Sequence, residues 1–232
     1  RDDVESRGLG DVYKRQAHEL RTPLAMMQTK LELFTEEHSD VDAETSKLVQ
    51  FQIDQVDRLT SLVRTLLEMS NLQSVSRSDE IELAPLIDEI LTDLTTLAEQ
   101  KNITLHQNCE DVHMIGSDTL IYRLLFNLIE NAIKYNHSGG SVTVSMQQED
   151  QQVLLHIADT GCGIPEKYRE SIFQPFFRVD KSRSRQMGGV GLGLALVREI
   201  AVLHGGSVCV EPSSKDGTTF AVKLPLNGEK TE

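Results

Sequence analysis

One stretch of the sequence, DTLIYRLLFNLIENAIKY from Asp118 to Tyr135, predicts an amphipathic helix with two chemically distinct faces. With about 100° of rotation per residue, its apolar and polar side chains fall on separate arcs. The apolar arc holds Ile121, Leu124, Leu125, Leu128 and Ala132, and the polar arc holds Asn127, Glu130, Asn131 and Lys134. A solvated helix face is the plain interpretation of such a polar stripe. Two amides, a carboxylate and an ammonium group could also hold a metal ion and phosphate oxygens.

The segments around this helix predict a sheet and further helices. Val142–Met146 alternates apolar and polar residues, Val153–Ala158 is a more continuous apolar run, and Phe220–Leu224 alternates again. Helical patterns recur at Pro85–Glu99 and Leu192–His204. Helices that are segregated from a mixed sheet indicate a two-layer α/β sandwich.

The first third of the chain has the pattern of helices packed on helices. Apolar residues recur in alternating steps of three and four from Ala17 to Phe34, which is an a/d seam, and again from Val49 to Met69. Turn and N-cap residues at His38–Asp42 separate the two runs. We therefore expect an antiparallel helical hairpin, which makes the fold class α+β. Because one hairpin cannot enclose its own seam, we expect a homodimer in which two hairpins form a four-helix bundle.

These patterns divide the chain into domains. We expect a hairpin domain at 17–73, a Ser-rich linker at 74–80, an α/β domain at 81–226 and a tail at 227–232. Residues 1–16 show no useful period, and Asp11–Gln16 look like the in-frame translation of a transposon end used in sequencing-library adapters. We therefore expect an assembly scar there rather than a genuine short helix, and a natural protein that extends further upstream.

The composition of the 232-residue chain argues against several function classes. Lys and Arg number 23 and Asp and Glu number 36, a net charge of −13, which argues against a nucleic-acid partner and against contact with an anionic membrane. No apolar run approaches the ~18–20 residues that a membrane helix needs. Three scattered cysteines, Cys109, Cys162 and Cys209, fit a reducing compartment and lack the paired spacing of a zinc site.

Two glycine-containing loops are candidates for ligand binding. Asp159–Pro165 (DTGCGIP) follows a buried strand, its glycines permit close backbone approach, and the Asp159 carboxylate can accept from an exocyclic amine such as that of adenine. Gly188–Leu194 (GGVGLGL) opens a helix whose free N–H groups suit phosphate. It matches neither the Walker loop nor the Gly-x-Gly-x-x-Gly fingerprint. Each loop alone could be a plain tight turn.

Two further polar segments flank the second loop. Arg178–Gln186 (RVDKSRSRQ) carries four cationic residues, which is typical either of a mobile lid over an anionic ligand or of a disordered loop. Asp216–Phe220 (DGTTF) enters the last predicted strand and on its own would be a turn.

Taken in order, these segments resemble the motifs of the sensor histidine kinases. The matching segments are His18–Leu24 (HELRTPL) for the H box, Asn127–Tyr135 for the N box, Phe173–Arg178 (FQPFFR) for the F box, and Asp159–Pro165, Gly189–Leu194 and Gly217–Phe220 for the glycine boxes. The resemblance covers about Ala17 to Leu226, and no core motif position is plainly degenerate. Cys162, between two glycines, is less usual there than a polar residue.

The resemblance implies a Bergerat-type ATP-binding domain in the second part of the chain, with ATP and Mg²⁺ as its ligands. Asp159 would recognise the adenine amine, and Asn131 would hold a Mg²⁺ ion that bridges the phosphates, with Asn127 or Glu130 behind it. The other implied ATP-binding residues are Lys134 and Arg178, which would neutralise phosphate charge, and Tyr135, Gly161, Gly163, Gly189, Gly191, Leu192, Gly193 and Thr218.

His18 is the implied phosphoacceptor of the hairpin. An unperturbed imidazole has a pKa of about 6.5, so most of it is a neutral nucleophile near neutral pH. Glu19 can orient the ring and take up its proton, and Thr22, one turn on, would position a water that hydrolyses a phosphorylated partner. A zinc site of the His-Glu-x-x-His type is excluded because the fifth residue is Thr22.

The implied function is ATP-dependent autophosphorylation of a histidine, followed by phosphoryl transfer to an aspartate on the receiver domain of a response regulator, with phosphatase activity towards that regulator. The implied parent protein is anchored in the cell membrane with this part in the cytoplasm. One alternative is a non-kinase ATPase of the same superfamily, although such proteins lack a hairpin with a counterpart of His18. The other is a nucleotide-binding scaffold or a phosphatase-only regulator, against which the intact Asn131, Lys134 and Asp159 argue.

Overall fold

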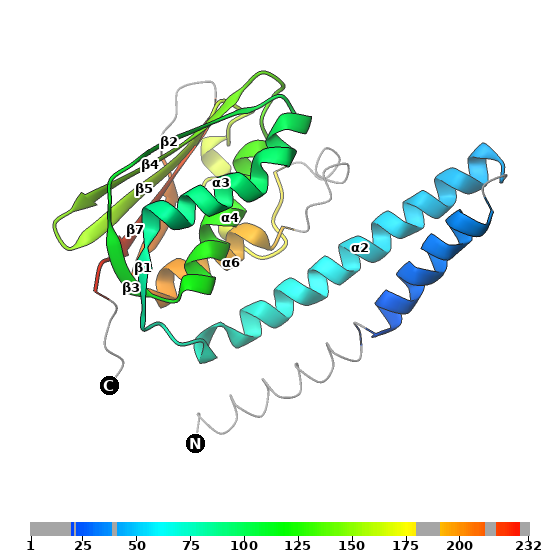
Figure 1. Cartoon of the computed structure of the whole chain (residues 1–232), viewed down its shortest axis with the longest axis horizontal. Helices are drawn as coiled ribbons and strands as arrows, with labels where there is room; N and C mark the ends of the chain where they lie inside the picture. Colours follow the sequence, from blue (N-terminus) through cyan, green and yellow to red (C-terminus); the bar gives the residue numbers. More distant parts are fainter. Residues whose placement is uncertain (1–19, 21, 39–40, 180–190, 212–216, 228–232) are drawn as a thin grey trace. The chain divides into compact units, whose positions relative to one another are not determined.

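The computed structural model describes residues 20, 22–38, 41–179, 191–211 and 217–227. Contacts between residues divide the chain into two units: Arg1–Gln73 with Lys181–Leu192, and Ser74–Asp180 with Gly193–Glu232. The first unit is helical, and the second combines helices with sheets (Figure 1). Within the described ranges, no helix has both the length and the apolar character needed to cross a membrane.

The helical unit is a hairpin of two antiparallel helices (Figure 1). The first is described over residues 22–37, and α2 spans Ala43–Asn71. Asp42 is the N-cap of α2, since its Oδ1 accepts the backbone N–H groups of Glu44 and Thr45, each at 2.9 Å. The turn predicted from the sequence therefore ends at a capping residue that fixes the start of α2.

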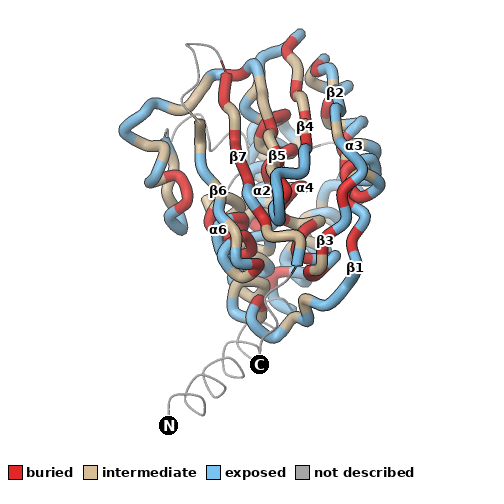
Figure 2. The backbone as a smooth tube through the Cα atoms, turned by 90° about the vertical axis from the view of Figure 1, so that its left-hand side faces the viewer, coloured by how far each residue is buried: buried red, intermediate tan, exposed pale blue. Residues whose placement is uncertain are grey.

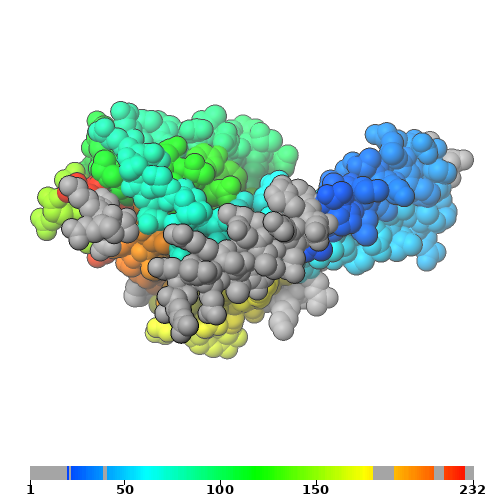
Figure 3. All heavy atoms as spheres, turned by 90° about the horizontal axis from the view of Figure 1, so that it is seen from below, coloured from blue at the N-terminus to red at the C-terminus, as the bar shows by residue number. Residues whose placement is uncertain are grey.

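The seam of the hairpin is only partly covered. Leu24 and Val56 are buried, whereas other seam residues are about half exposed. The exposed ones are Leu20 (52%), Met27 (54%), Leu59 (48%) and Leu66 (47%). Figure 3 shows the first helix, in dark blue, lying against the paler first part of α2. One hairpin thus leaves apolar side chains that a second hairpin could cover.

The second unit is built on a five-stranded sheet with the strand order β2-β4-β5-β7-β6. Its strands are β2 (Thr104–Cys109), β4 (Ser141–Glu149), β5 (Gln152–Asp159), β6 (Ser207–Val210) and β7 (Thr218–Pro225). β2 and β4 run parallel, and the other neighbours are antiparallel. The helices α3 (Leu83–Gln100), α4 (Asp118–Lys134) and α6 (Gly193–Leu203) cover one face (Figure 1). The predicted fold class, a helical hairpin followed by a two-layer α/β sandwich, is confirmed.

Alternate residues of the strands form the core beneath the helices. The buried positions are Val142, Val144 and Met146 in β4, Val153, Leu155 and Ile157 in β5, and Phe220, Val222 and Leu224 in β7. Figure 2 shows these buried segments, in red, along the central strands. The alternation expected of strands that bury one face is therefore present where the sequence predicted it.

A second, two-stranded sheet pairs β1 (Asp79–Glu82) with β3 (His113–Gly116) in antiparallel register. β1 begins inside the stretch 74–80, which the sequence assigned to a linker. Ile81 is the one buried residue of β1, and the two residues of β1 that fall within the stretch are exposed and polar. The composition of the stretch therefore does not distinguish a strand from a linker. Short 3₁₀ helices occupy Leu72–Ser74, Glu166–Tyr168 and Ser171–Phe173.

Candidate functional site

The polar stripe of α4 lies on the half-buried face of that helix. Its four residues are Asn127, Glu130, Asn131 and Lys134, and the apolar arc predicted for the same helix is fully buried. Glu130 Oε1 and Lys134 Nζ form an ion pair at 2.8 Å. Asn127 Nδ2 donates to the Arg123 carbonyl at 2.8 Å. The ammonium group that we expect to neutralise phosphate is therefore paired here with a carboxylate one turn earlier on the helix.

Asp159 ends β5 as a half-buried carboxylate with fixed orientation. Its Oδ1 accepts the backbone N–H groups of Gly161 at 2.8 Å and of Thr218 at 3.2 Å. Burial raises the pKa of Asp159, and the hydrogen bonds from Gly161 and Thr218 oppose that rise. Thr218, at the start of β7, pairs with Asp159 in the ladder, so the segment that alone would be a turn contributes to this site.

Two glycines allow the protein's own backbone to pack around Asp159. A Cβ on Gly161 would lie 2.5 Å from the Tyr135 carbonyl oxygen and 2.9 Å from Asp159 Oδ1. Gly217 has φ of 102°, and a side chain there would overlap the Asp159 carbonyl oxygen. We expected Gly161 and Gly163 to make room for a ligand. The contacts give Gly161 a structural reason as well, because a side chain there would push the loop away from the end of α4; the expected role of both glycines towards a ligand stays a prediction.

The start of α6 packs against the polar stripe. A Cβ on Gly193 would lie 2.7 Å from Asn127 Oδ1, so this glycine lets the N-terminus of α6 approach α4 closely. Gly191 has φ of 80°, in the left-handed region that favours glycine, and Leu192 is buried. The N-terminus of α6 at Gly193 is therefore next to Asn127, and a helix N-terminus is a place where an anion is stabilised.

The remaining predicted site residues lie in both units. Tyr135 is the C-cap of α4 and is exposed, Arg178 is half-buried, and Thr22 is exposed on the first helix of the hairpin. His18, Glu19, Gly189 and residues 180–186 of the predicted lid lie outside the described residues. Their predicted roles rest on the sequence.

Sequence reasoning missed the residues that hold both ends of α4. Lys101 Nζ donates to the carbonyl oxygens of Ile133 and Lys134 at the C-terminal end, and burial lowers the pKa of Lys101, with the charge of Lys134 as a second cause. At the other end, His204 Nε2 accepts the Ser117 N–H at 3.1 Å. The partners are 32, 33 and 87 residues apart along the chain, so no local pattern signals these contacts.

The donor set suits a Mg²⁺ ion that is bound together with phosphates. Among the residues that the structure describes, no group of three or more His, Cys, Asp or Glu is placed to hold a metal ion. The polar stripe offers the Asn131 amide oxygen, with the Glu130 carboxylate beside it. Because Mg²⁺ keeps several waters and takes one or two protein oxygens plus substrate phosphates, these residues fit it.

Comparisons with known families agree with this arrangement. The family described as histidine kinase-, DNA gyrase B- and HSP90-like ATPase matches residues 116–228, and the His Kinase A phospho-acceptor domain matches residues 15–75. The chain belongs to the sensor histidine kinases. The family predicted from the order of the motifs is thus confirmed.

The chain is similar to the sensor histidine kinase RppB of Synechocystis sp., with 34% identity over 216 residues that make up 90% of this chain and 47% of that protein. It shares the fold of full-length ShkA in complex with AMPPNP, with a TM-score of 0.75 and 24% identity over 94% of this chain and 46% of that one. The kinase ThkA, in complex with the response regulator protein TrrA, gives a TM-score of 0.68 and 26% identity over 99% of this chain and 66% of that one. The chain spans about half the length of the relatives it matches.

Proposed function

We propose that this histidine kinase transfers the γ-phosphoryl group of ATP to His18, and from there to an aspartate on the receiver domain of a response regulator. The observation that carries this proposal is the Asp159 carboxylate, which the backbone N–H groups of Gly161 and Thr218 hold at the end of β5. It lies in the same unit as the polar stripe of α4, so one unit contains groups for a base and for phosphates.

The site is specific for adenine, because the ionised carboxylate of Asp159 can only accept hydrogen bonds. The 6-amino group of adenine donates to it, whereas the carbonyl of guanine at the same place would repel it. The stripe on α4 would serve the triphosphate: the Asn131 amide oxygen would hold Mg²⁺, and Lys134 and Arg178 would neutralise charge. When bound, Mg²⁺ would offset the negative charge on the phosphate oxygens. The N-terminus of α6 at Gly193 adds backbone donors.

His18 supplies the nucleophile of the reaction. One imidazole nitrogen attacks the γ-phosphorus, the bond from that phosphorus to the bridging oxygen breaks, and ADP leaves with the electron pair. Glu19 takes up the proton from the other imidazole nitrogen. The phosphoryl group then passes from the His18 nitrogen to a carboxylate oxygen of the regulator. Thr22, which is exposed, would position a water that later hydrolyses the phosphorylated regulator.

The hairpin indicates two protein partners for this chain, a second copy and a response regulator. Residues 17–73 would form the dimerisation and phosphotransfer domain, and residues 81–226 the catalytic domain. The half-exposed seam residues, such as Leu59 and Leu66, would be covered by the hairpin of a second copy. A response regulator is the expected second partner, and the similarity to ThkA, whose structure contains TrrA, supports it. The expected location is the cytoplasmic side of a membrane-anchored protein.

Incubation of the chain with γ-labelled ATP and Mg²⁺ tests this proposal. The wild type should acquire an acid-labile, alkali-stable label, and His18→Gln and Asn131→Asp should abolish it. His38→Gln, which alters an exposed histidine of the same hairpin, is the matched control and should keep the label. Hydrolysis of ATP without labelling of the chain would favour a non-kinase ATPase of the same superfamily.

A further inference from the structure

Asn136 and Thr160 form a hydrogen-bonded connection that the proposed reaction does not use. Thr160 Oγ1 accepts the Ser141 N–H at 2.9 Å and donates to Asn136 Oδ1 at 3.1 Å. Asn136 Nδ2 in turn donates to the Ser141 carbonyl at 2.9 Å. The two side chains therefore link three segments, namely the residue after the α4 C-cap, the start of β4 and the residue that follows Asp159.

The backbone around this connection is closely packed. A Cβ on Gly140 would lie 2.6 Å from Thr160 Oγ1 and would overlap Asn136 Oδ1. The Thr160 N–H donates to the Ser141 carbonyl at 3.2 Å, and the Cys162 N–H donates to the Tyr135 carbonyl at 3.3 Å. The loop after Asp159 is thus attached to the end of α4 by main-chain and side-chain bonds together.

We propose that Thr160 and Asn136 are positioning residues for nucleotide binding. They hold the loop from Thr160 to Gly163 against the end of α4, so that the Asp159 carboxylate keeps its place relative to the polar stripe. This inference rests on the proposed function, because it assigns the two residues to the binding of the base by Asp159. Neither residue touches the nucleotide in this account.

Loss of the hydrogen bonds between Asn136 and Thr160 should weaken recognition of the base more than binding of the phosphates. Asp159 is the covalent neighbour of Thr160, whereas Asn131 and Lys134 are held by the turns of α4 itself. Loss of the Thr160 hydroxyl should therefore weaken ATP binding, whereas GTP binding, which Asp159 opposes rather than assists, should not fall. The expected loss for ATP is about two- to tenfold, the range for one orienting hydrogen bond.

Thr160→Val and Thr160→Ser form the matched pair for the test. Valine keeps the shape and removes the hydroxyl, whereas serine restores the hydroxyl. Thr143→Val, which makes the same change on β4, is the control for a general effect on the sheet. The dissociation constants for ATP and for GTP in the presence of Mg²⁺, measured by calorimetry on the whole chain, and the thermal unfolding midpoint are the readouts.

Thr160→Val should lower the ratio of ATP affinity to GTP affinity, whereas Thr160→Ser and Thr143→Val should retain it. A folded Thr160→Val protein with an unchanged ratio would overturn the inference, and so would a fall in the unfolding midpoint with no change in the ratio. If Thr160→Val does not fold, the ratio of ATP affinity to GTP affinity is measured for Asn136→Asp, which removes the donor to the Ser141 carbonyl. An unchanged ratio in that variant would overturn the inference. A wild-type chain that binds no ATP would instead contradict the proposed function.

Discussion

His204, just after the end of α6, accepts the backbone N–H of Ser117, at the start of α4, through its Nε2 at 3.1 Å. Its Nδ1 lies 2.8 Å from the Ile200 carbonyl oxygen, which can only accept, so the ring carries its hydrogen on Nδ1 and is neutral. Both residues are buried. The contact therefore fixes two of the helices that carry predicted site residues, and it does so only while the imidazole is uncharged.

Acidification is expected to destabilise the second unit through His204. Burial, together with the charge of Arg77, lowers the pKa of His204 in the folded state. Below about pH 6.5 the unfolded chain therefore binds the proton more readily than the folded one. The stability that neutral His204 contributes is complete above that pH and is lost as the pH falls from there through the lower pKa of the folded state.

Thermal unfolding midpoints measured from about pH 8 down to about pH 5.5 check this dependence. His204→Gln is the comparison, because its amide oxygen can accept from Ser117 and does not titrate. The midpoint of the wild type should fall more steeply than that of the variant. Equal slopes in the two proteins would contradict the role given to His204.

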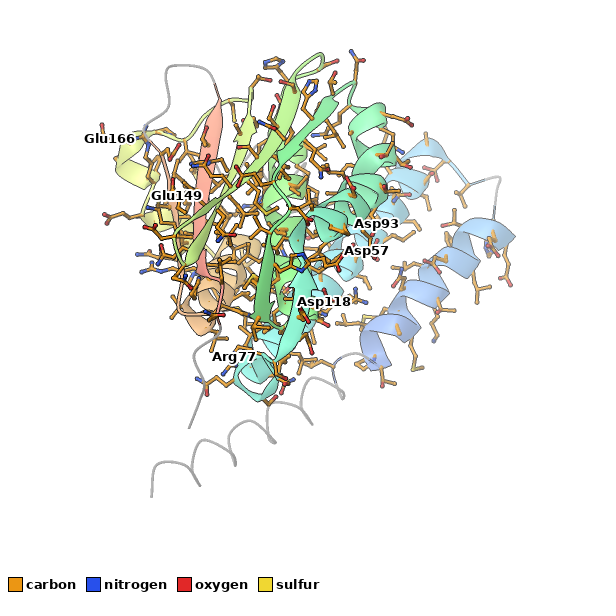
Figure 4. The ribbon with its side chains drawn as sticks, turned by 60° about the vertical axis from the view of Figure 1, so that its left-hand side comes forward. Asp57, Arg77, Asp93, Asp118, Glu149 and Glu166 are labelled. Atoms are coloured by element: carbon orange, nitrogen blue, oxygen red, sulfur yellow. The ribbon has the colours of Figure 1, made fainter. Side chains whose placement is uncertain are left out.

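Asp79 is expected to stabilise α4 from outside the helix. Its Oδ2 accepts the Asp118 N–H at 3.2 Å, while the N-cap residue Ser117 makes no capping bond with its own side chain. Asp79→Ala should lower the free energy of unfolding by about 0.5–2 kcal/mol, as the loss of a helix cap does. Figure 4 shows Asp118, the residue whose N–H group Asp79 accepts, at the same end of this unit as Arg77. Urea unfolding measures the effect, with the exposed neighbour Glu80→Ala as the control. A similar loss in both variants would refute the cap.

Gly161→Ala should disrupt both the fold and nucleotide binding. The added Cβ would lie 2.5 Å from the Tyr135 carbonyl oxygen, so the loop or the end of α4 must move, at a cost of about 1–3 kcal/mol. Gly139→Ala is a useful control, since Gly139 has a positive φ but open space around it. It should cost about 1 kcal/mol from backbone strain alone and leave ATP affinity intact. Equal ATP affinities in the two variants would argue against the packing role of Gly161.

Asp159→Asn should weaken ATP binding without unfolding the protein. The amide oxygen can still accept from Gly161 and Thr218, but the amide N–H₂ group would face the amine of adenine. The affinity for ATP should fall by about 10- to 100-fold, in line with the loss of a base-reading contact. Calorimetry with ATP and Mg²⁺ measures it, and an unchanged affinity would remove Asp159 from the base-binding role.

Local periodicity was sufficient to predict the elements of the site but not their connections. The sequence predicted a helix from Asp118 to Tyr135, and α4 ends at Lys134, because an apolar stripe with a 3.6-residue period has few other solutions. It did not predict that Thr218 would hold Asp159, because these residues are 59 positions apart and meet only through the register of β5 and β7.

The same limit explains the other differences. The role of Gly161 depends on the Tyr135 carbonyl, a backbone atom that leaves no mark on the sequence pattern. The first two residues of β1, Asp79 and Glu80, were assigned to a linker because a short strand with one buried residue has the composition of a loop. The order of the motifs was sufficient to predict the family, because that order involves many segments of the chain and depends on no single contact.

Site mapping of the phosphoryl group tests the central claim most directly. After incubation with ATP and Mg²⁺, intact-mass analysis followed by fragmentation under alkaline conditions should locate one added phosphoryl group on the imidazole of His18. No such mass should appear in Asn131→Asp or without Mg²⁺. A phosphoryl group on any other residue, or a chain that binds ATP and stays unmodified, would contradict the account.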